Sequence, residues 1–146
     1  MAQEVAAECA NQTFTERISW IEARRKQGNV LYAESKFEEA LNVYMTALCA
    51  LDFTTCKDKV SEQQSSMASA SNKVPVLNNM AMCLAKQGHH DRCLKMLDQV
   101  LQIESTNAKA LARRLQCLLD LSQFDQARSE TKELKAKLKD HGKFGW

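Results

Sequence analysis

Residues 24–32, RRKQGNVLY, and residues 37–48, FEEALNVYMTAL, decide the fold of this chain. In the second segment the apolar residues recur at intervals of three and four, which is the pattern of one helical face. Each segment also carries a small residue, Gly28 or Ala40, at a point where two helices can cross closely. A short turn at residues 35–36 separates the segments. Together they predict a hairpin of two antiparallel helices.

The hairpin pattern recurs along the chain at a spacing of 34 residues. When residues 74–107 are shifted by 34 positions, Gly88 aligns with Ser122. Residues 21–54 align with the same repeat pattern. A helix–turn–helix period of 34 residues with small residues at repeat positions 8 and 20 is the tetratricopeptide signature. We therefore predict an all-α fold of three tandem tetratricopeptide repeats that form a right-handed superhelical array. Leu115 departs from the pattern, because it occupies the first small position of the third repeat.

Local signals predict where the helices begin and end. Thr13 and Glu16 have the spacing of a capping box, so the first long helix is expected to begin near Phe14. Gly88 is expected to end the first helix of the second repeat. The two helices of the third repeat are expected to span Ala108 to about Leu121 and Phe124 to about Lys139, with a turn at residues 122–123.

Two regions lie outside the periodic pattern. Residues 1–14 have no strong apolar anchor, so this leader is expected either to be frayed or to form a short extra helix. Residues 54–73 are polar and Ser-rich, so we expect the preceding helix to continue for a turn or two and a flexible loop to follow. Pro75 then fits the first turn of a new helix. The predicted segments are a leader (1–14), a repeat domain (15–141) with repeats 21–54, 74–107 and 108–141 and an insertion loop (55–73), and a tail (142–146).

Composition limits the classes of function. The net charge is only +2, from 20 basic and 18 acidic residues, which argues against a general nucleic-acid or membrane-surface protein. No apolar run approaches the length of a membrane span. Six cysteines are scattered without a Cys-x-x-Cys pair, as expected of small buried thiols in a reducing compartment. We therefore expect a cytosolic or nuclear protein, with the cytoplasm preferred, and we expect it to be a monomer without a cofactor.

The sequence offers little support for catalysis or metal binding. It contains no nucleophile–base constellation, no Gly-rich phosphate loop and no metal-ligand spacing. His89-His90-Asp91 falls in an expected turn and is interpreted as surface. The lysines of the last helix alternate with acidic residues and lack interleaved aromatic residues, which favours a solvated helix face over a nucleic-acid site. We expect a binding module rather than an enzyme.

Cations and amides recur near the starts of the first helices of the repeats. Arg25 and Asn29 are four residues apart, as are Lys109 and Arg113, so each pair stacks on one helical face. Asn79, with Asn78 beside it, adds amides between them. Three cations and two amides without an evident acidic partner predict a site for an anion. A free C-terminal carboxylate with a side-chain carboxylate nearby would satisfy such a site through charge-assisted hydrogen bonds.

These segments resemble the tetratricopeptide domains of co-chaperones that bind the C-terminal EEVD of cytosolic heat-shock chaperones, and most of all those of FKBP-type immunophilins. The resemblance covers about residues 17–140 and includes VLNNMAMCLAKQG (76–88) and NAKALARRLQ (107–116). It implies that the first helix of each repeat lines a concave groove. It also implies a carboxylate clamp of Lys, Asn, Asn, Lys and Arg. The clamp residues carry over to Arg25, Asn29, Asn79, Lys109 and Arg113.

The resemblance implies distinct roles within the clamp. The first four residues would hold the terminal Asp of the chaperone tail, and Arg113 would support the peptide further upstream. Arg25 stands where the family has Lys, which keeps the charge and changes the geometry. The groove wall would comprise Tyr32, Met82 and Gln116. The alternative is a tetratricopeptide scaffold that binds an internal segment of another protein.

Overall fold

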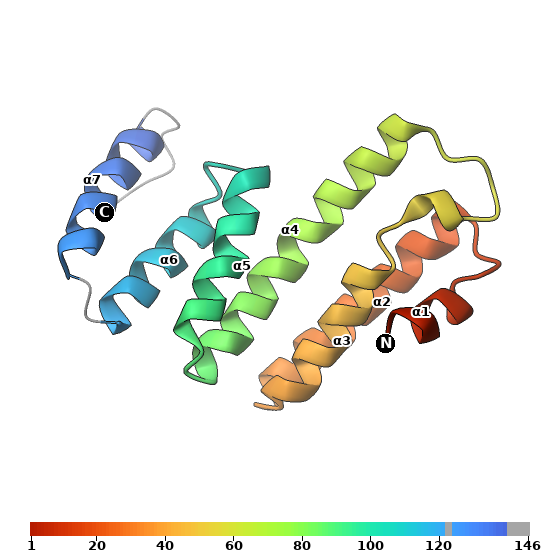
Figure 1. Cartoon of the computed structure of the whole chain (residues 1–146), viewed down its shortest axis with the longest axis horizontal. Helices are drawn as coiled ribbons and strands as arrows, with labels where there is room; N and C mark the ends of the chain where they lie inside the picture. Colours follow the sequence, from red (N-terminus) through yellow and green to blue (C-terminus); the bar gives the residue numbers. More distant parts are fainter. Residues whose placement is uncertain (122–123, 140–146) are drawn as a thin grey trace.

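The computed structural model describes residues 1–121 and 124–139, and within them it contains helices and no strand. The predicted all-α fold is confirmed. Consecutive long helices pack as antiparallel hairpins, and the hairpins stand side by side in a row (Figure 1). The helices are α1 (Ala2–Glu8), α2 (Phe14–Ala33), α3 (Phe37–Cys49), the 3-10 turn η1 (Phe53–Thr55), α4 (Glu62–Lys86), α5 (His90–Ile103), α6 (Ala108–Asp120) and α7 (Phe124–Lys139).

The predicted start of α2 is confirmed by its cap. The backbone N–H of Glu16 donates to Thr13 Oγ1 at 3.2 Å, and the backbone N–H of Thr13 donates to Glu16 Oε1 at 3.3 Å. These two bonds satisfy backbone donors that a helix start otherwise leaves unpaired. α2 therefore begins at Phe14, as its sequence indicates.

The crossing of α2 and α3 requires Gly28. A Cβ atom at this position would lie 2.4 Å from Cε1 of Tyr44, which is far closer than carbon atoms approach each other. Ala40, the second small residue of this hairpin, is completely buried. The spacing of small residues that predicted the hairpin thus reflects a close helix–helix contact.

The two described hairpin turns have the same backbone conformation. Gly88 follows α4 with φ 81°, and Ser35, at the equivalent place after α2, has φ 62°. The N–H groups of the two residues that follow, His89 and Lys36, donate to carbonyls five residues earlier at 2.8 and 2.9 Å. This left-handed helix ending satisfies the last carbonyls and reverses the chain. The third turn, at residues 122–123, lies outside the described residues.

The insertion loop expected at residues 55–73 is wrong for residues 62–73. These residues form the first half of α4, whose start is capped by Ser61 and Gln64, and Pro75 lies inside the helix instead of in its first turn. The missing N–H of Pro75 leaves the carbonyl of Ser71 without its helical donor, but Ser71 is exposed, so water can replace that bond. Helix α4 therefore continues through a residue that was expected to mark its beginning.

The helix before this region is also shorter than expected. Instead of continuing beyond residue 54, α3 ends at Cys49, and Asp52 caps the 3-10 turn that follows. The carbonyls of Ala50 and Asp52 accept hydrogen bonds from the buried guanidinium of Arg17, at 3.2 and 2.9 Å. A long side chain from α2 thus takes the carbonyls that a continuing helix would use.

The leader forms the short helix α1, which settles the alternatives left open by its sequence. Val5 and Cys9 are buried in the core, and Arg17 Nη2 donates to the carbonyl of Cys9 at 3.1 Å. Arg17 is only 2% exposed, and its guanidinium also donates to side-chain oxygens of Gln12 and Thr55. One buried arginine therefore holds the leader, α2 and the segment after α3 together.

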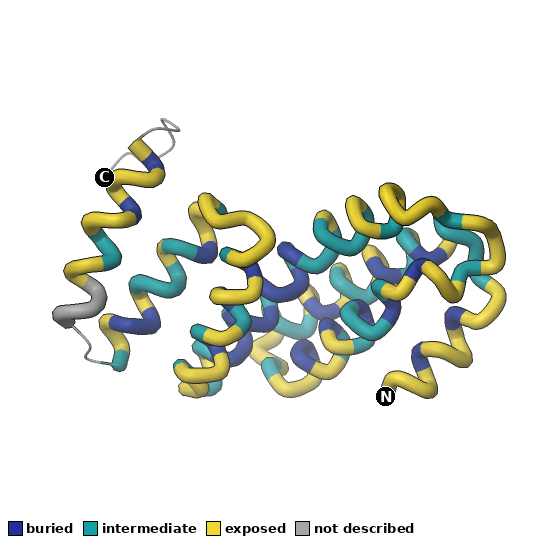
Figure 2. The backbone as a smooth tube through the Cα atoms, turned by 45° about the horizontal axis from the view of Figure 1, so that its top comes forward, coloured by how far each residue is buried: buried dark blue, intermediate teal, exposed yellow. Residues whose placement is uncertain are grey.

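The core lies along the inner sides of the stacked helices, where Figure 2 shows the buried residues. Helix α4 is its centre, because it contacts α2, α3, α5 and α6 and its buried residues lie in its second half. On the far side of α6, Arg114 pairs with Asp98 at 2.8 Å and also with Glu130, which links α5, α6 and α7. No helix among the described residues is both long and apolar enough to cross a membrane.

Candidate functional site

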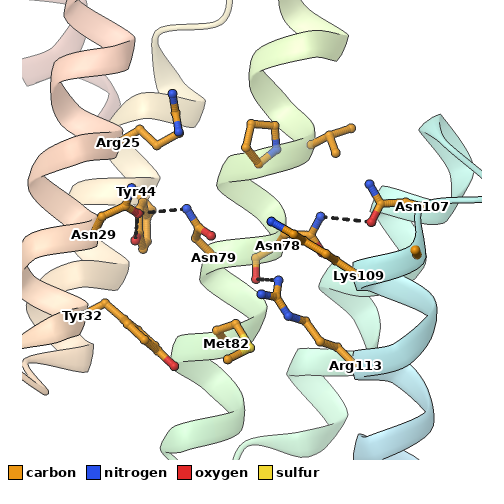
Figure 3. Close-up of a pocket in the computed structure, with 13 residues that line it drawn as sticks. Arg25, Asn29, Tyr32, Tyr44, Asn78, Asn79, Met82, Asn107, Lys109 and Arg113 are labelled. Carbon is orange, nitrogen blue, oxygen red and sulfur yellow. Dashed lines mark hydrogen bonds between the residues drawn. The ribbon is translucent and has the colours of Figure 1, made fainter. Parts of the chain in front are cut away.

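A pocket of about 630 Å³ lies between α2, α4 and α6, and all five predicted clamp residues line it. We call it the clamp pocket. Figure 3 shows its side chains converging from these three helices. The structure therefore brings together residues that are up to 88 positions apart in the sequence. Their binding role stays a prediction. The clamp residues are Arg25 and Asn29 from α2, Asn79 from α4, and Lys109 and Arg113 from α6.

The helix periodicity explains why these side chains share one pocket. Residues four apart on a helix lie one turn above each other, so Arg25 and Asn29 present one stripe of α2. Lys109 and Arg113 present the corresponding stripe of α6. Because α4 lies between the two helices, Asn79 is placed between both stripes.

The two clamp asparagines are held in place by a shared oxygen. Asn29 Oδ1 accepts a hydrogen bond from Tyr44 Oη at 2.6 Å and another from Asn79 Nδ2 at 3.0 Å. With its oxygen occupied in this way, the amide nitrogen of Asn29 is a donor available to a ligand. Burial raises the pKa of Tyr44 to about 12, so its hydroxyl keeps the proton that it donates.

Tyr44 is a pocket residue that the sequence interpretation missed. Its spacing within α3 marked it only as part of the apolar stripe. The ring does pack against Gly28 in the core, while the hydroxyl reaches Asn29 in the pocket. The absence of a side chain at Gly28, one residue before Asn29, was the available signal that an aromatic ring fills this crossing.

The three cations of the clamp pocket have no carboxylate partner within the described part of the chain. The arginines next to them in the sequence do form ion pairs: Arg24 pairs with Glu8 at 3.0 Å, and Arg114 pairs with Asp98. Each paired arginine lies next to an unpaired one along its helix. Positive charge is therefore left uncompensated on the pocket side, where an anionic ligand would find it.

Arg113 is a partly buried cation of the clamp pocket. Its guanidinium donates to the backbone carbonyl of Asn78 at 3.3 Å, which directs the side chain across α4. Burial lowers the pKa of Arg113 from its ordinary value, because desolvation disfavours the charged form. An incoming carboxylate would relieve that cost by supplying the missing counter-charge.

Asn78 lines the clamp pocket, as the sequence suggested, but its side chain is nearly buried. It is 4% exposed, and its Nδ2 lies 3.5 Å from Asn107 Oδ1. The same Asn107 oxygen caps α6 by accepting from the N–H of Ala110 at 2.9 Å. Asn78 therefore contacts Asn107, the residue that caps the start of α6, and so helps to place Lys109 in the pocket.

The predicted wall residues separate into two groups. Tyr32 and Met82 line the clamp pocket, and the ring of Tyr32 also packs edge-on against Phe37 with centroids 5.4 Å apart. Gln116 does not line it. Its Nε2 donates to Asp120 at 2.9 Å, and it lines a smaller neighbouring pocket of about 240 Å³ that also contacts Met82.

Other candidate sites examined in the sequence have no comparable geometry. Across residues 1–121 and 124–139, no group of three or more His, Cys, Asp or Glu side chains is placed to hold a metal ion. The lysines of α7 are exposed on that helix, and Lys143 lies outside the described residues. The clamp pocket is therefore the site on which we base a function.

Comparison with known proteins connects this geometry to a family. Residues 84–143 match the tetratricopeptide repeat family. The chain is 33% identical over 121 residues to outer envelope protein 61 of Arabidopsis thaliana, covering 83% of this chain and 20% of that protein. It is 31% identical to the peptidyl-prolyl cis-trans isomerase FKBP42 of the same plant, covering 83% of this chain and 33% of the relative. The chain thus spans between a fifth and a third of the length of these two relatives.

The fold comparison agrees with the sequence comparison. The crystal structure of a multi-domain immunophilin from Arabidopsis thaliana superimposes with a TM-score of 0.68. That match covers 82% of this chain and 46% of the other, at 31% sequence identity. The similarity therefore concerns a helical part of a larger molecule.

Proposed function

Because this chain is a tetratricopeptide repeat domain similar to those of FKBP-type immunophilins, we propose that its clamp pocket captures the C-terminal end of a partner polypeptide. The proposed partner is a cytosolic heat-shock chaperone whose chain ends in EEVD. One observation carries the proposal. The five clamp residues line one pocket, and its three cations have no carboxylate partner within the described residues. The proposed role is peptide capture rather than catalysis.

The proposed ligand matches the pocket in charge and in hydrogen bonding. A terminal Asp carries two carboxylates, which are acceptors only, and the pocket offers donors from Arg25, Lys109 and the amide nitrogen of Asn29. Arg113 lies one turn beyond Lys109 on α6 and would contact the peptide further upstream. Tyr32 and Met82 provide the apolar part of the surface for upstream side chains.

A second candidate function is a scaffold that binds an internal segment of another protein. Arg25 favours it, because its forked guanidinium differs in geometry from the Lys found in the co-chaperones that this domain resembles. An internal segment has no terminal carboxylate. The two functions therefore differ in whether the pocket needs a free chain end.

The deciding experiment compares a peptide ending in EEVD with its C-terminally amidated twin. Isothermal titration calorimetry is expected to give a Kd in the micromolar range for the free acid, which corresponds to roughly −8 kcal/mol. Amidation is expected to weaken binding by at least about tenfold, because it leaves cations facing a neutral group. Equal affinities would exclude the clamp function and favour the scaffold.

Variants locate the binding on the proposed surface. Lys109→Ala and Arg113→Ala are expected to lower the affinity by at least about tenfold, because each removes a donor from the pocket. Lys109→Ala is expected to leave the melting temperature nearly unchanged, since Lys109 is exposed, whereas Arg113→Ala also removes the hydrogen bond to the Asn78 carbonyl and is expected to lower it by a few degrees. Lys26→Ala is the matched control, since Lys26 is an exposed cation on α2 that does not line the pocket. A similar loss in Lys26→Ala would show that binding follows overall charge instead of the clamp.

The proposal places the domain in the cytoplasm, where the proposed partner is found. All six cysteines are free, and four of them are buried, which fits a compartment that keeps thiols reduced. No cofactor is needed, because the recognition requires only charge and hydrogen bonds from the protein's own side chains.

A further inference from the structure

Two buried cysteines from neighbouring hairpins are in direct contact. Cys93 lies on α5 and Cys117 on α6, and their Sγ atoms are 3.1 Å apart. Their side chains are 1% and 3% exposed. A disulfide needs the two sulfurs to approach to about 2.05 Å, so the gap to be closed is roughly 1 Å. Neither residue was expected to do more than fill space.

The contact is reachable by a small molecule. A pocket of about 240 Å³ is lined by both cysteines, together with Met82 and Arg113 of the adjoining clamp pocket. Hydrogen peroxide is small enough to enter such a space, whereas a peptide-sized thiol reagent is not. Burial raises the pKa of the Cys93 thiol to about 12, so only a small fraction is thiolate at neutral pH and its oxidation by peroxide is slow.

We propose that Cys93 and Cys117 form a reversible disulfide that ties the second hairpin to the third. Peroxide oxidises one thiolate to a sulfenic acid and leaves as hydroxide, which takes up the proton that the thiol released. The second sulfur then attacks the sulfenic sulfur and displaces its oxygen as water. Two thiols and one peroxide thus become one disulfide and two waters, and a dithiol reductant reverses the change.

The position of the bond connects it to the clamp pocket. Cys117 lies four residues after Arg113, which places both on the same face of α6. Cys93 lies on α5, whose hairpin partner α4 carries Asn79. The disulfide therefore fixes the spacing between the two hairpins that supply the central and third parts of the clamp.

The test treats the reduced full chain with hydrogen peroxide, removes the oxidant, unfolds the chain in guanidinium chloride, alkylates free thiols and digests with trypsin. The expected product is a disulfide-linked pair of peptides, residues 93–95 with residues 115–128, that separates on reduction. The oxidised chain is expected to melt roughly 5–10 °C higher, because the bond constrains the unfolded chain. Recovery of both residues as alkylated thiols, at a peroxide dose that oxidises the partly exposed Cys49, would overturn the proposal.

Two variants separate the disulfide from general oxidation. Cys93→Ala is expected to fold, because the equivalent position of the first hairpin is the buried Ala40, and to lose both the linked peptides and the rise in melting temperature. Cys83→Ala is the matched control, since it removes another fully buried thiol and is expected to keep both effects. A rise of the same size in oxidised Cys93→Ala would contradict the assignment.

Discussion

Individual side chains in this domain serve the core and the clamp pocket at once. Tyr44 packs its ring against Gly28, and its hydroxyl donates to Asn29 at 2.6 Å. Asn29 in turn accepts from Asn79. A contact inside the first hairpin therefore determines how an amide is turned in the pocket.

Tyr44→Phe is expected to weaken binding of the EEVD-ending peptide about three- to tenfold, because one neutral hydrogen bond contributes about 0.5–1.5 kcal/mol. The ring and its packing remain, so the melting temperature is expected to change by only a few degrees. Titration calorimetry and thermal melts measure the two quantities. Tyr32→Phe is the control, because no hydrogen bond of the Tyr32 hydroxyl holds a clamp residue in the described contacts. An unchanged affinity in Tyr44→Phe would show that Asn29 needs no support.

Gly28→Ala is expected to destabilise the fold by about 1–3 kcal/mol, because the added Cβ would overlap the ring of Tyr44. Urea unfolding measures this change. Gly88 is the control that isolates backbone strain from steric overlap. A Cβ atom at Gly88 would meet nothing within 4 Å, so a substitution there tests only the left-handed backbone conformation, with φ 81°. Gly88→Asn is expected to be tolerated, because Asn adopts left-handed conformations readily, whereas Gly28→Asn is not. Equal stability of the two Asn variants would contradict the close crossing.

At the scale of the elements, two features depart from what their local sequence indicates. Helix α4 continues through Pro75, and α3 ends early because Arg17 takes the carbonyls that follow it. Both features join the first hairpin to the second. They therefore control how α2 and α4, which carry three of the five clamp residues, are spaced.

Arg17→Met is expected to cost roughly 2–4 kcal/mol of stability, because it leaves the buried carbonyls of Cys9 and Ala50 without donors. Hydrogen exchange in α1 should accelerate as the leader loses its anchor. Arg24→Met is the control, since it removes a partly exposed ion pair and a cation–π contact with Trp20, and is expected to cost about 1 kcal/mol. Equal losses for the two variants would argue against a structural role for the buried guanidinium.

Pro75→Ala is expected to stabilise the domain by about 1 kcal/mol or more. Alanine restores an N–H inside α4, where proline is about 3 kcal/mol less favourable, and the greater freedom of the unfolded chain offsets part of the gain. Thermal and urea unfolding measure the difference. If residues 62–73 were a loop and Pro75 began the helix, the same change would bring no gain, so the experiment tests the continuous helix directly.

At the scale of the whole molecule, charge is balanced overall and unbalanced at the clamp pocket. The chain carries a net charge of +2, yet Arg25, Lys109 and Arg113 stand together without a carboxylate partner in the described ranges. The outer faces pair their arginines across helices. Electrostatic attraction for an acidic ligand is therefore local.

Peptide binding is accordingly expected to weaken about tenfold when salt rises from about 0.05 M to about 0.5 M, because screening shortens the range of the pocket's charges. Calorimetry across the series measures the slope. Lys109→Ala is expected to flatten it, whereas Lys26→Ala is expected to leave it unchanged. A salt-independent affinity would show that apolar contacts with Tyr32 and Met82 dominate the binding.

Much of the fold could be predicted because its signals are local. The capping box at Thr13, the small residues Gly28 and Ala40, and the helix-ending Gly88 each act within a few residues of the chain. The 34-residue period then predicted further hairpins of the same kind along the chain. The positions of the clamp residues followed from the same period together with the family resemblance, and the structure places all five in one pocket.

Sequence alone therefore determined the helical hairpins, because helix periodicity and caps are properties of neighbouring residues, and together with the family resemblance it indicated the five clamp residues. Only the tertiary structure decided which distant groups touch: Tyr44 with Asn29, Arg17 with the carbonyls beyond α3, and Cys93 with Cys117. It also decided that α4 continues through Pro75. The physical reason is that such contacts depend on the distance and angle at which separate helices cross, and those are set by packing of the whole core.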